Sequence, residues 1–105
     1  MARRTVNFTY KNTDYSLGYT LATVEQMERG GFVRGELGSK MADMSQKLFY
    51  GAFLAEHKNI KRKLVEEIYN NLKDKEGLLM ALVELYDEAC DALLEEGNVS
   101  WTMSE

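Results

Sequence analysis

Positions 48 to 55 hold the sequence Leu48-Phe49-Tyr50-Gly51-Ala52-Phe53-Leu54-Ala55, eight consecutive apolar or small residues. On a helix these side chains point in every direction, and a helix that is apolar on all sides is buried on all sides. Either an N-terminal hairpin and the last two helices enclose this block, or part of its surface meets a partner. We predict one helix around it, over residues 40–56, with Ser39 as the capping residue. Its inner stripe would consist of Met41, Met44, Leu48, Ala52 and Ala55.

Upstream of this helix, residues 5–19 predict a β-hairpin. Apolar residues occupy every second position in two short runs, Val6, Phe8 and Tyr10, then Tyr15, Leu17 and Tyr19. This is the period of half-buried strands, and the four turn-tolerant residues 11–14 would connect them. Because two strands alone are only marginally stable in water, the hairpin must lay one face on the helices.

A short helix over residues 21–29 follows the hairpin. Thr20 or Thr23 can cap its start, and Gly30 can close it in the left-handed conformation. The next segment, residues 31–39, contains three glycines among a few apolar residues, Phe32 included. We expect it to be a mobile loop.

Two further helices are expected in the second half of the chain. The first covers residues 60–73 with Asn59 as its cap, and the second covers residues 75–96 with Asp74 as its cap and Gly97 as its stop. The second carries two apolar rows, Leu78, Leu82, Leu85 and Ala89, and Leu79, Tyr86, Cys90 and Leu93. Met80 falls among the acidic residues opposite and is expected to be exposed. A C-terminal tail, residues 98–105, alternates again and could add a short strand to the hairpin or to another chain.

These elements predict a single α+β domain, residues 1–105, with an N-terminal hairpin followed by about four helices. The length of 105 residues fits one domain. No apolar run approaches the roughly 18 residues that span a bilayer, and Met1 to Tyr10 do not resemble a secretion leader. A cytoplasmic protein without membrane association is therefore expected.

The residues that could carry chemistry are few. The chain has one histidine, His57, expected as a hydrogen-bonding residue at a helix end, and one cysteine, Cys90, expected as a small core residue. Four nitrogen or sulfur ligands for zinc cannot be assembled from them. The spacing of Gly30 and Gly35 matches a phosphate-binding loop, but Glu36 stands where the lysine should be. We predict no catalytic, cofactor-binding or metal-binding residues.

The net charge of −4 makes nucleic-acid binding an unlikely function for the whole chain. The feature that favours it is a basic cluster, Lys58, Lys61, Arg62 and Lys63. Because of this net charge, a solvated first helical turn is the favoured explanation of the cluster.

Four segments together resemble the small tail assembly chaperones of long-tailed, siphovirus-type phages and prophages: residues 15–20, 27–32, 48–58 and 98–101. The resemblance covers most of the chain and rests on the order of elements and a few apolar blocks. It implies a protein without enzymatic activity or cofactors. Such a protein binds the long, helical tape measure protein, and its partners can include the tail tube protein. It keeps the tape measure protein soluble in the bacterial host cytoplasm until tail tube subunits polymerise around it.

Candidate partner-binding residues follow from the apolar surfaces, since the family has no fixed set to carry over. They lie in the apolar block, the glycine-rich loop, the acidic helix face and the tail: Phe32, Phe49, Tyr50, Phe53, Leu54, Met80 and Trp101. The four from the block qualify only if they are exposed. Two other functions stay open, a connector protein retained in the phage particle and a small nucleic-acid-binding regulator. The chain could also form a homo-oligomer.

Overall fold

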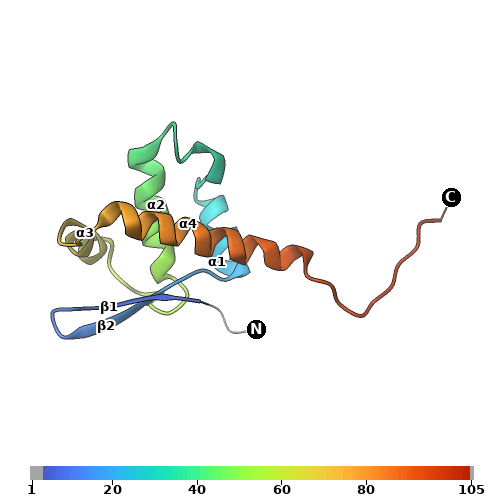
Figure 1. Ribbon diagram of the computed structural model, residues 1–105, viewed down its shortest axis with the longest axis horizontal. Coiled ribbons are helices and arrows are strands. Elements are labelled where there is room, and N and C mark those ends of the chain that lie inside the picture. Colours follow the sequence, from blue (N-terminus) through green and yellow to red (C-terminus); the bar gives the residue numbers. More distant parts are fainter. Residues whose placement is uncertain (1–3, 105) are drawn as a thin grey trace.

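A computed structural model describes residues 4–104 of the chain and confirms the α+β class. Within these described residues, a two-stranded antiparallel hairpin precedes four α-helices (Figure 1). The elements are β1 (Val6–Tyr10), β2 (Thr13–Leu17), α1 (Leu21–Arg29), α2 (Met41–Phe53), α3 (Arg62–Asn70) and α4 (Lys75–Asp91), with short 3-10 turns η1 (Arg34–Glu36) and η2 (Ala92–Leu94).

The hairpin turn is shorter than predicted. Tyr10 pairs with Thr13, which leaves only Lys11 and Asn12 between the strands. Their φ values of 48° and 65° are both positive, as a type I′ turn requires, and this turn matches the twist of the paired strands. The prediction of a four-residue connection was wrong because Thr13 and Asp14 belong to the strand.

Helix α1 has the predicted bounds, and Thr20 is its cap. The backbone N–H of Thr23 donates to Thr20 Oγ1 at 3.2 Å, and the N–H of Thr20 donates to Thr23 Oγ1 at 2.9 Å. The helical hydrogen bonds continue through Gly30, whose φ is −83°, and Gly31 takes the left-handed conformation at φ 99°. The prediction that Gly30 would do so was wrong by one residue.

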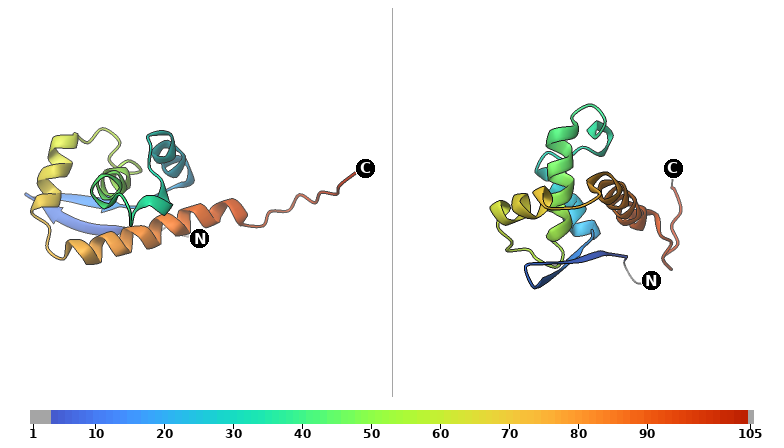
Figure 2. Two further views of the ribbon diagram at one scale, coloured as in Figure 1. Left: turned by 90° about the horizontal axis from the view of Figure 1, so that it is seen from above. Right: turned by 60° about the vertical axis from the view of Figure 1, so that its left-hand side comes forward.

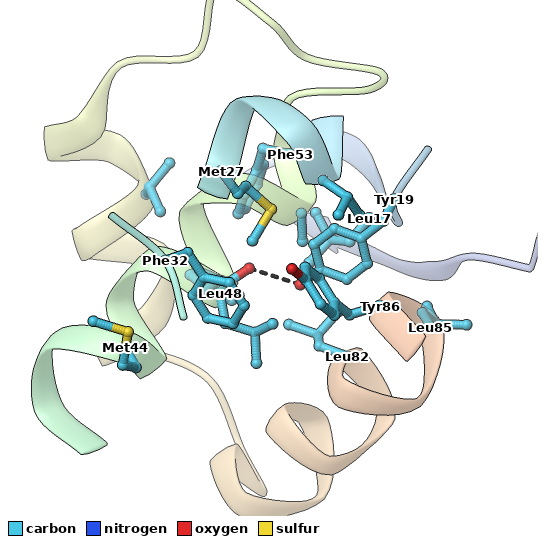
Figure 3. Packing of buried hydrophobic residues seen from close by; sticks show 14 of the residues in the cluster. Leu17, Tyr19, Met27, Phe32, Met44, Leu48, Phe53, Leu82, Leu85 and Tyr86 are labelled. Atoms are coloured by element: carbon cyan, nitrogen blue, oxygen red, sulfur yellow. Dashed lines mark hydrogen bonds between the residues drawn. The ribbon is translucent and has the colours of Figure 1, made fainter. Parts of the chain in front are cut away.

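Helix α2 lies at the centre of the domain. Leu48, Phe49 and Phe53 are at most 2% exposed. The ring of Phe53 packs edge-on against Tyr15 of the hairpin, and Phe49 packs against Tyr69 of α3. Helices α1 and α4 also contact α2, as Figure 3 shows for the residues around Leu48. The hairpin and the later helices therefore enclose most of the apolar block. This confirms the first of the two explanations for that part of the block.

The start sites of α2 and α3 differ from the predictions. Lys40, not Ser39, occupies the cap position of α2 and makes no side-chain cap, because the hydroxyl of Ser39 faces the carbonyl of Glu36 in the preceding turn. Helix α3 begins at Arg62, since Asn59 lies in a separate turn closed by a hydrogen bond from the N–H of Ile60 to the His57 carbonyl. Both helices are also shorter than expected at their C-terminal ends.

Helix α4 has the predicted cap, Asp74, whose Oδ1 accepts from the N–H of Gly77 at 3.1 Å. It ends at Asp91 instead of near Glu95. Its last turn holds no basic residue, and several carboxylates oppose the negative end of the helix dipole there. Leu93 consequently leaves the predicted apolar row and is 67% exposed.

Beyond η2 the chain leaves the body of the domain along the direction of α4 (Figures 1 and 2). The described residues of the predicted tail, 98–104, form no strand, and its last residue, Glu105, lies outside the described part. The tail explains why the radius of gyration is 15.8 Å when a compact chain of this length would have about 13 Å. Between residues 4 and 104, no helix is long and apolar enough to cross a bilayer.

Candidate functional site

The seven predicted contact residues divide into three groups by exposure. Phe32, Phe49 and Phe53 are buried in the core, at 2%, 2% and 0% exposed. Tyr50 and Leu54 are half-buried. Met80 and Trp101 are 66% and 80% exposed. Residues of the apolar block qualified as partner-binding candidates only if they were exposed, and Phe49 and Phe53 are not. Phe32 contacts Tyr86 in the core instead of lying on a loop surface.

An apolar groove lies next to Met80. It has a volume of about 720 Å³ and runs between the first half of α4, the N-terminal half of α2 and the segment after η1. The apolar side chains that line it are Leu37, Met41, Leu48, Tyr69, Leu79, Met80 and Val83. We call this surface the α2–α4 groove.

Two exposed methionines belong to the α2–α4 groove. Met80 on α4 was correctly predicted to be exposed. Met41 was predicted to be in the core, but it is 65% exposed because it stands in the first turn of α2, where that helix projects past the packed body (Figure 1). Methionine side chains are unbranched and polarizable, and they adapt to the shape of a bound partner.

A buried hydrogen bond joins the floor of the groove to the core. Leu48 is completely buried, and its carbonyl accepts a hydrogen bond of 2.7 Å from the hydroxyl of Tyr19 (Figure 3). Burial raises the pKa of Tyr19 well above its ordinary value, so this phenol stays a neutral donor. The ring of Tyr19 in turn packs edge-on against Tyr86 of α4 at 5.5 Å between centroids.

Polar contacts hold the two ends of the groove. Arg34 of η1 forms a two-pronged ion pair with Asp87 of α4, with nitrogen to oxygen distances of 3.0 and 3.1 Å, and this hydrogen bonding raises the pKa of Arg34. At the other end, Lys75 Nζ donates to the carbonyl of Leu72 at 3.0 Å and lies 5.6 Å from the ring centroid of Tyr69. Lys75 is therefore fixed at the edge of the mainly apolar groove, next to Glu76, which also lines it.

His57 and Cys90 have the structural roles that were predicted. His57 Nε2 accepts a hydrogen bond of 3.1 Å from the N–H of Ser16, which joins the end of α2 to the hairpin. Cys90 is half-buried against the core, and burial raises the pKa of its thiol. Within residues 4–104, no three His, Cys, Asp or Glu side chains are grouped so that they could hold a metal ion.

The basic cluster lies on the surface at the start of α3. Lys58, Lys61, Arg62 and Lys63 are all exposed. The guanidinium of Arg62 lies 4.4 Å from the ring centroid of Tyr50, so this side chain covers an aromatic ring of α2. Glu67, one helical turn after Lys63, accepts from the hydroxyl of Tyr10 at 2.7 Å and pairs with Lys11 at 3.1 Å.

Most residues of the α2–α4 groove were not identified as partner-binding candidates. The periodicity of the sequence identifies the apolar side of each helix. It does not show where the apolar sides of two helices leave a surface uncovered in the folded domain. The one sequence signal was Met80, an apolar residue on an acidic face.

Residues 1–104 match the family model described as "Domain of unknown function (DUF5055)", and the chain belongs to this family. No curated protein and no solved structure matches the chain significantly.

Proposed function

We propose that this DUF5055 protein is a phage tail assembly chaperone that binds the tape measure protein non-covalently in the host cytoplasm. It would keep that partner soluble until the tail tube polymerises around it. The single observation that supports this function best is the α2–α4 groove, an open apolar surface edged by the exposed side chains of Met41 and Met80.

The shape of the groove suits one face of an amphipathic helix. Such helices bind by laying their apolar side chains into a groove between other helices. Leu37, Leu79 and Val83, which are half-buried, would supply the apolar contact, and the two methionines would adjust to different helical sequences along a long partner. Lys75 would favour a carboxylate near the end of the bound segment.

The groove also suits a temporary partner. It is open to solvent, and the exposed side chains around it do not enclose a bound helix completely. A tail tube subunit that covers more of the client helix could therefore displace the chaperone, because competition between partners depends on the difference of their affinities.

A connector protein retained in the particle is the second candidate. The observation that favours it is the exposed tail, in which Val99, Trp101 and Met103 are 80–88% exposed and available for a permanent contact with a neighbouring subunit.

Coexpression tests the chaperone function. The client would be the longest predicted helical protein encoded beside this chain in the same phage or prophage. We expect the client to be soluble and to copurify with this chain only when both are expressed, and we expect this chain to be absent from finished particles. A client that is equally soluble without the chain would contradict the chaperone function, and recovery of the chain from particles would favour the connector.

A further inference from the structure

The C-terminal tail presents apolar side chains that have no cover in the structure. Val99, Trp101 and Met103 are 88%, 80% and 86% exposed. They alternate with Ser100 and Thr102, so in an extended chain all three project from one side. Large aromatic side chains of this kind are common anchors of protein contacts, because they bury much area with few rotatable bonds.

The same chain carries an apolar surface that lacks an occupant, the α2–α4 groove. Its volume of about 720 Å³ lies within the roughly 300–1,000 Å³ of sites that hold drug-sized molecules, so it has room for an indole ring. Its lining is mainly apolar, with the charged side chains of Lys75 and Glu76 on α4, and the tail between Gly97 and Glu105 carries no charged side chain. An uncharged, apolar segment therefore brings no ionic group of its own that must be desolvated when it enters the groove.

We propose that residues 98–104 of one copy dock into the α2–α4 groove of a second copy, with Trp101 as the anchor. Docking in this manner needs no client, so its failure would leave the proposed chaperone function untouched.

Docking of the tail within one chain would require a tight reversal after η2, which favours a second copy. At 1.5 Å per residue, Leu94 lies at least about 21 Å along the axis of α4 from Met80. If Glu95 and Glu96 formed a tight reversal, the four residues from Gly97 to Trp101 would return about 13 Å along the helix. Trp101 would then stop about 8 Å short of Met80 and about 3 Å short of Val83, so docking within one chain depends on this reversal, whereas the chain continues past η2 away from the body.

The direction of the tail supports the same choice. It continues past the C-terminal end of α4 and away from the body, whereas the groove involves the N-terminal half of α4 (Figures 1 and 2). A neighbouring copy can meet the tail there without any change in the tail's own domain. If two copies exchange tails, the contact closes as a dimer, because each supplies one tail and one groove.

The chain contains its own probe for this contact, since Trp101 is its only tryptophan. A Trp101→Ser variant keeps the groove but gives no tryptophan emission. Dilute wild-type protein should emit at the long wavelength of a hydrated indole. Adding an excess of the Trp101→Ser variant should shift the emission to shorter wavelength as Trp101 enters the added grooves.

Groove variants locate the docking site. In the Trp101→Ser background, Met80→Glu or Met41→Glu places a charge at an exposed position of the groove, and at least tenfold more of either titrant should be needed for the same shift. Ala22→Glu, at an exposed position on α1 outside the groove, is the matched control and should act like Trp101→Ser alone.

Three results would overturn the proposal. The first is an emission that stays at long wavelength at every concentration of added variant. The second is a short-wavelength emission of the dilute protein that added grooves do not change, which would mean docking within one chain. The third is an equal shift with both groove variants, which would place the tail elsewhere, for example on the free edge of the hairpin.

Discussion

The side chain of Met27 on α1 occupies the space that a side chain at residue 51 of α2 would need. A Cβ atom built at Gly51 would lie 2.7 Å from both Cγ and Cε of Met27 and closer still to its sulfur. Met27 is itself 6% exposed, so it has little room to move. The missing side chain of Gly51 therefore permits the close packing of α1 on α2.

Gly51→Ala is expected to destabilise the domain by about 1–2 kcal/mol. Overpacking costs about 1–3 kcal/mol, of which up to about 1 kcal/mol is regained because alanine is the better helix former. Urea denaturation would measure the change. In a Met27→Ala background the same substitution should become neutral or stabilising, and an equal loss in both backgrounds would contradict the contact.

Asp74→Ala is expected to cost about 2 kcal/mol. Asp74 caps α4 and has a positive φ of 50°, so alanine would lose the hydrogen bond to Gly77 and meet the steric cost of the left-handed region. Asp74→Asn keeps the acceptor and tolerates this conformation, so its denaturation midpoint should stay near that of the wild type. An asparagine variant as unstable as the alanine variant would show that the cap is not the cause.

Glu67 should make stability depend on pH in the acid range. Hydrogen bonds from Tyr10 and Lys11 hold the pKa of Glu67 below its ordinary 4.5, so the folded state binds fewer protons than the unfolded state. The stabilisation is present above pH 4.5 and is lost as the pH falls through the lowered pKa. Glu67→Gln should be less stable than wild type at pH 7, and the difference should shrink below pH 4.5. Glu66→Gln, which removes the neighbouring charge but keeps the contacts of Glu67 with Tyr10 and Lys11, is the control and should retain the acid-range loss of stability that Glu67 causes.

The thiol of Cys90 should react slowly in the folded protein. Burial raises its pKa above the ordinary 9.0, which lowers the thiolate fraction, and the thiolate is the reactive form. At pH 8, modification by an aromatic disulfide reagent should be slower in the native chain than in the urea-unfolded chain. Equal rates would show that the core around α4 is open at this position.

The fold could be predicted where a local signal sets the structure. The alternation of apolar and polar residues predicted the hairpin. The pair Thr20 and Thr23 predicted where α1 begins, and Asp74 predicted where α4 begins. The errors concern boundaries that depend on tertiary contacts. Ser39 and Asn59 are good capping residues by type, but each lies in a turn whose hydrogen bonds direct it elsewhere.

The candidate site was less accessible from the sequence. An apolar residue on a helix face gives the same pattern whether another helix covers it or not. Phe53 and Met41 were both assigned to apolar positions of α2, yet one is completely buried and the other is 65% exposed. The hairpin covers Phe53, whereas α4 and the segment after η1 leave Met41 at the open edge of the groove, and this placement is a property of the whole chain.

The solubility of the client in the presence of groove variants tests the central claim most directly. The long helical client would be coexpressed with wild-type protein, with Met80→Glu, with Met41→Glu and with Ala22→Glu, all of which change exposed residues and should fold. We predict that both groove variants lose the client from the soluble fraction while Ala22→Glu retains it. A client that stays soluble and bound with both groove variants would contradict the assignment of the α2–α4 groove as the binding surface.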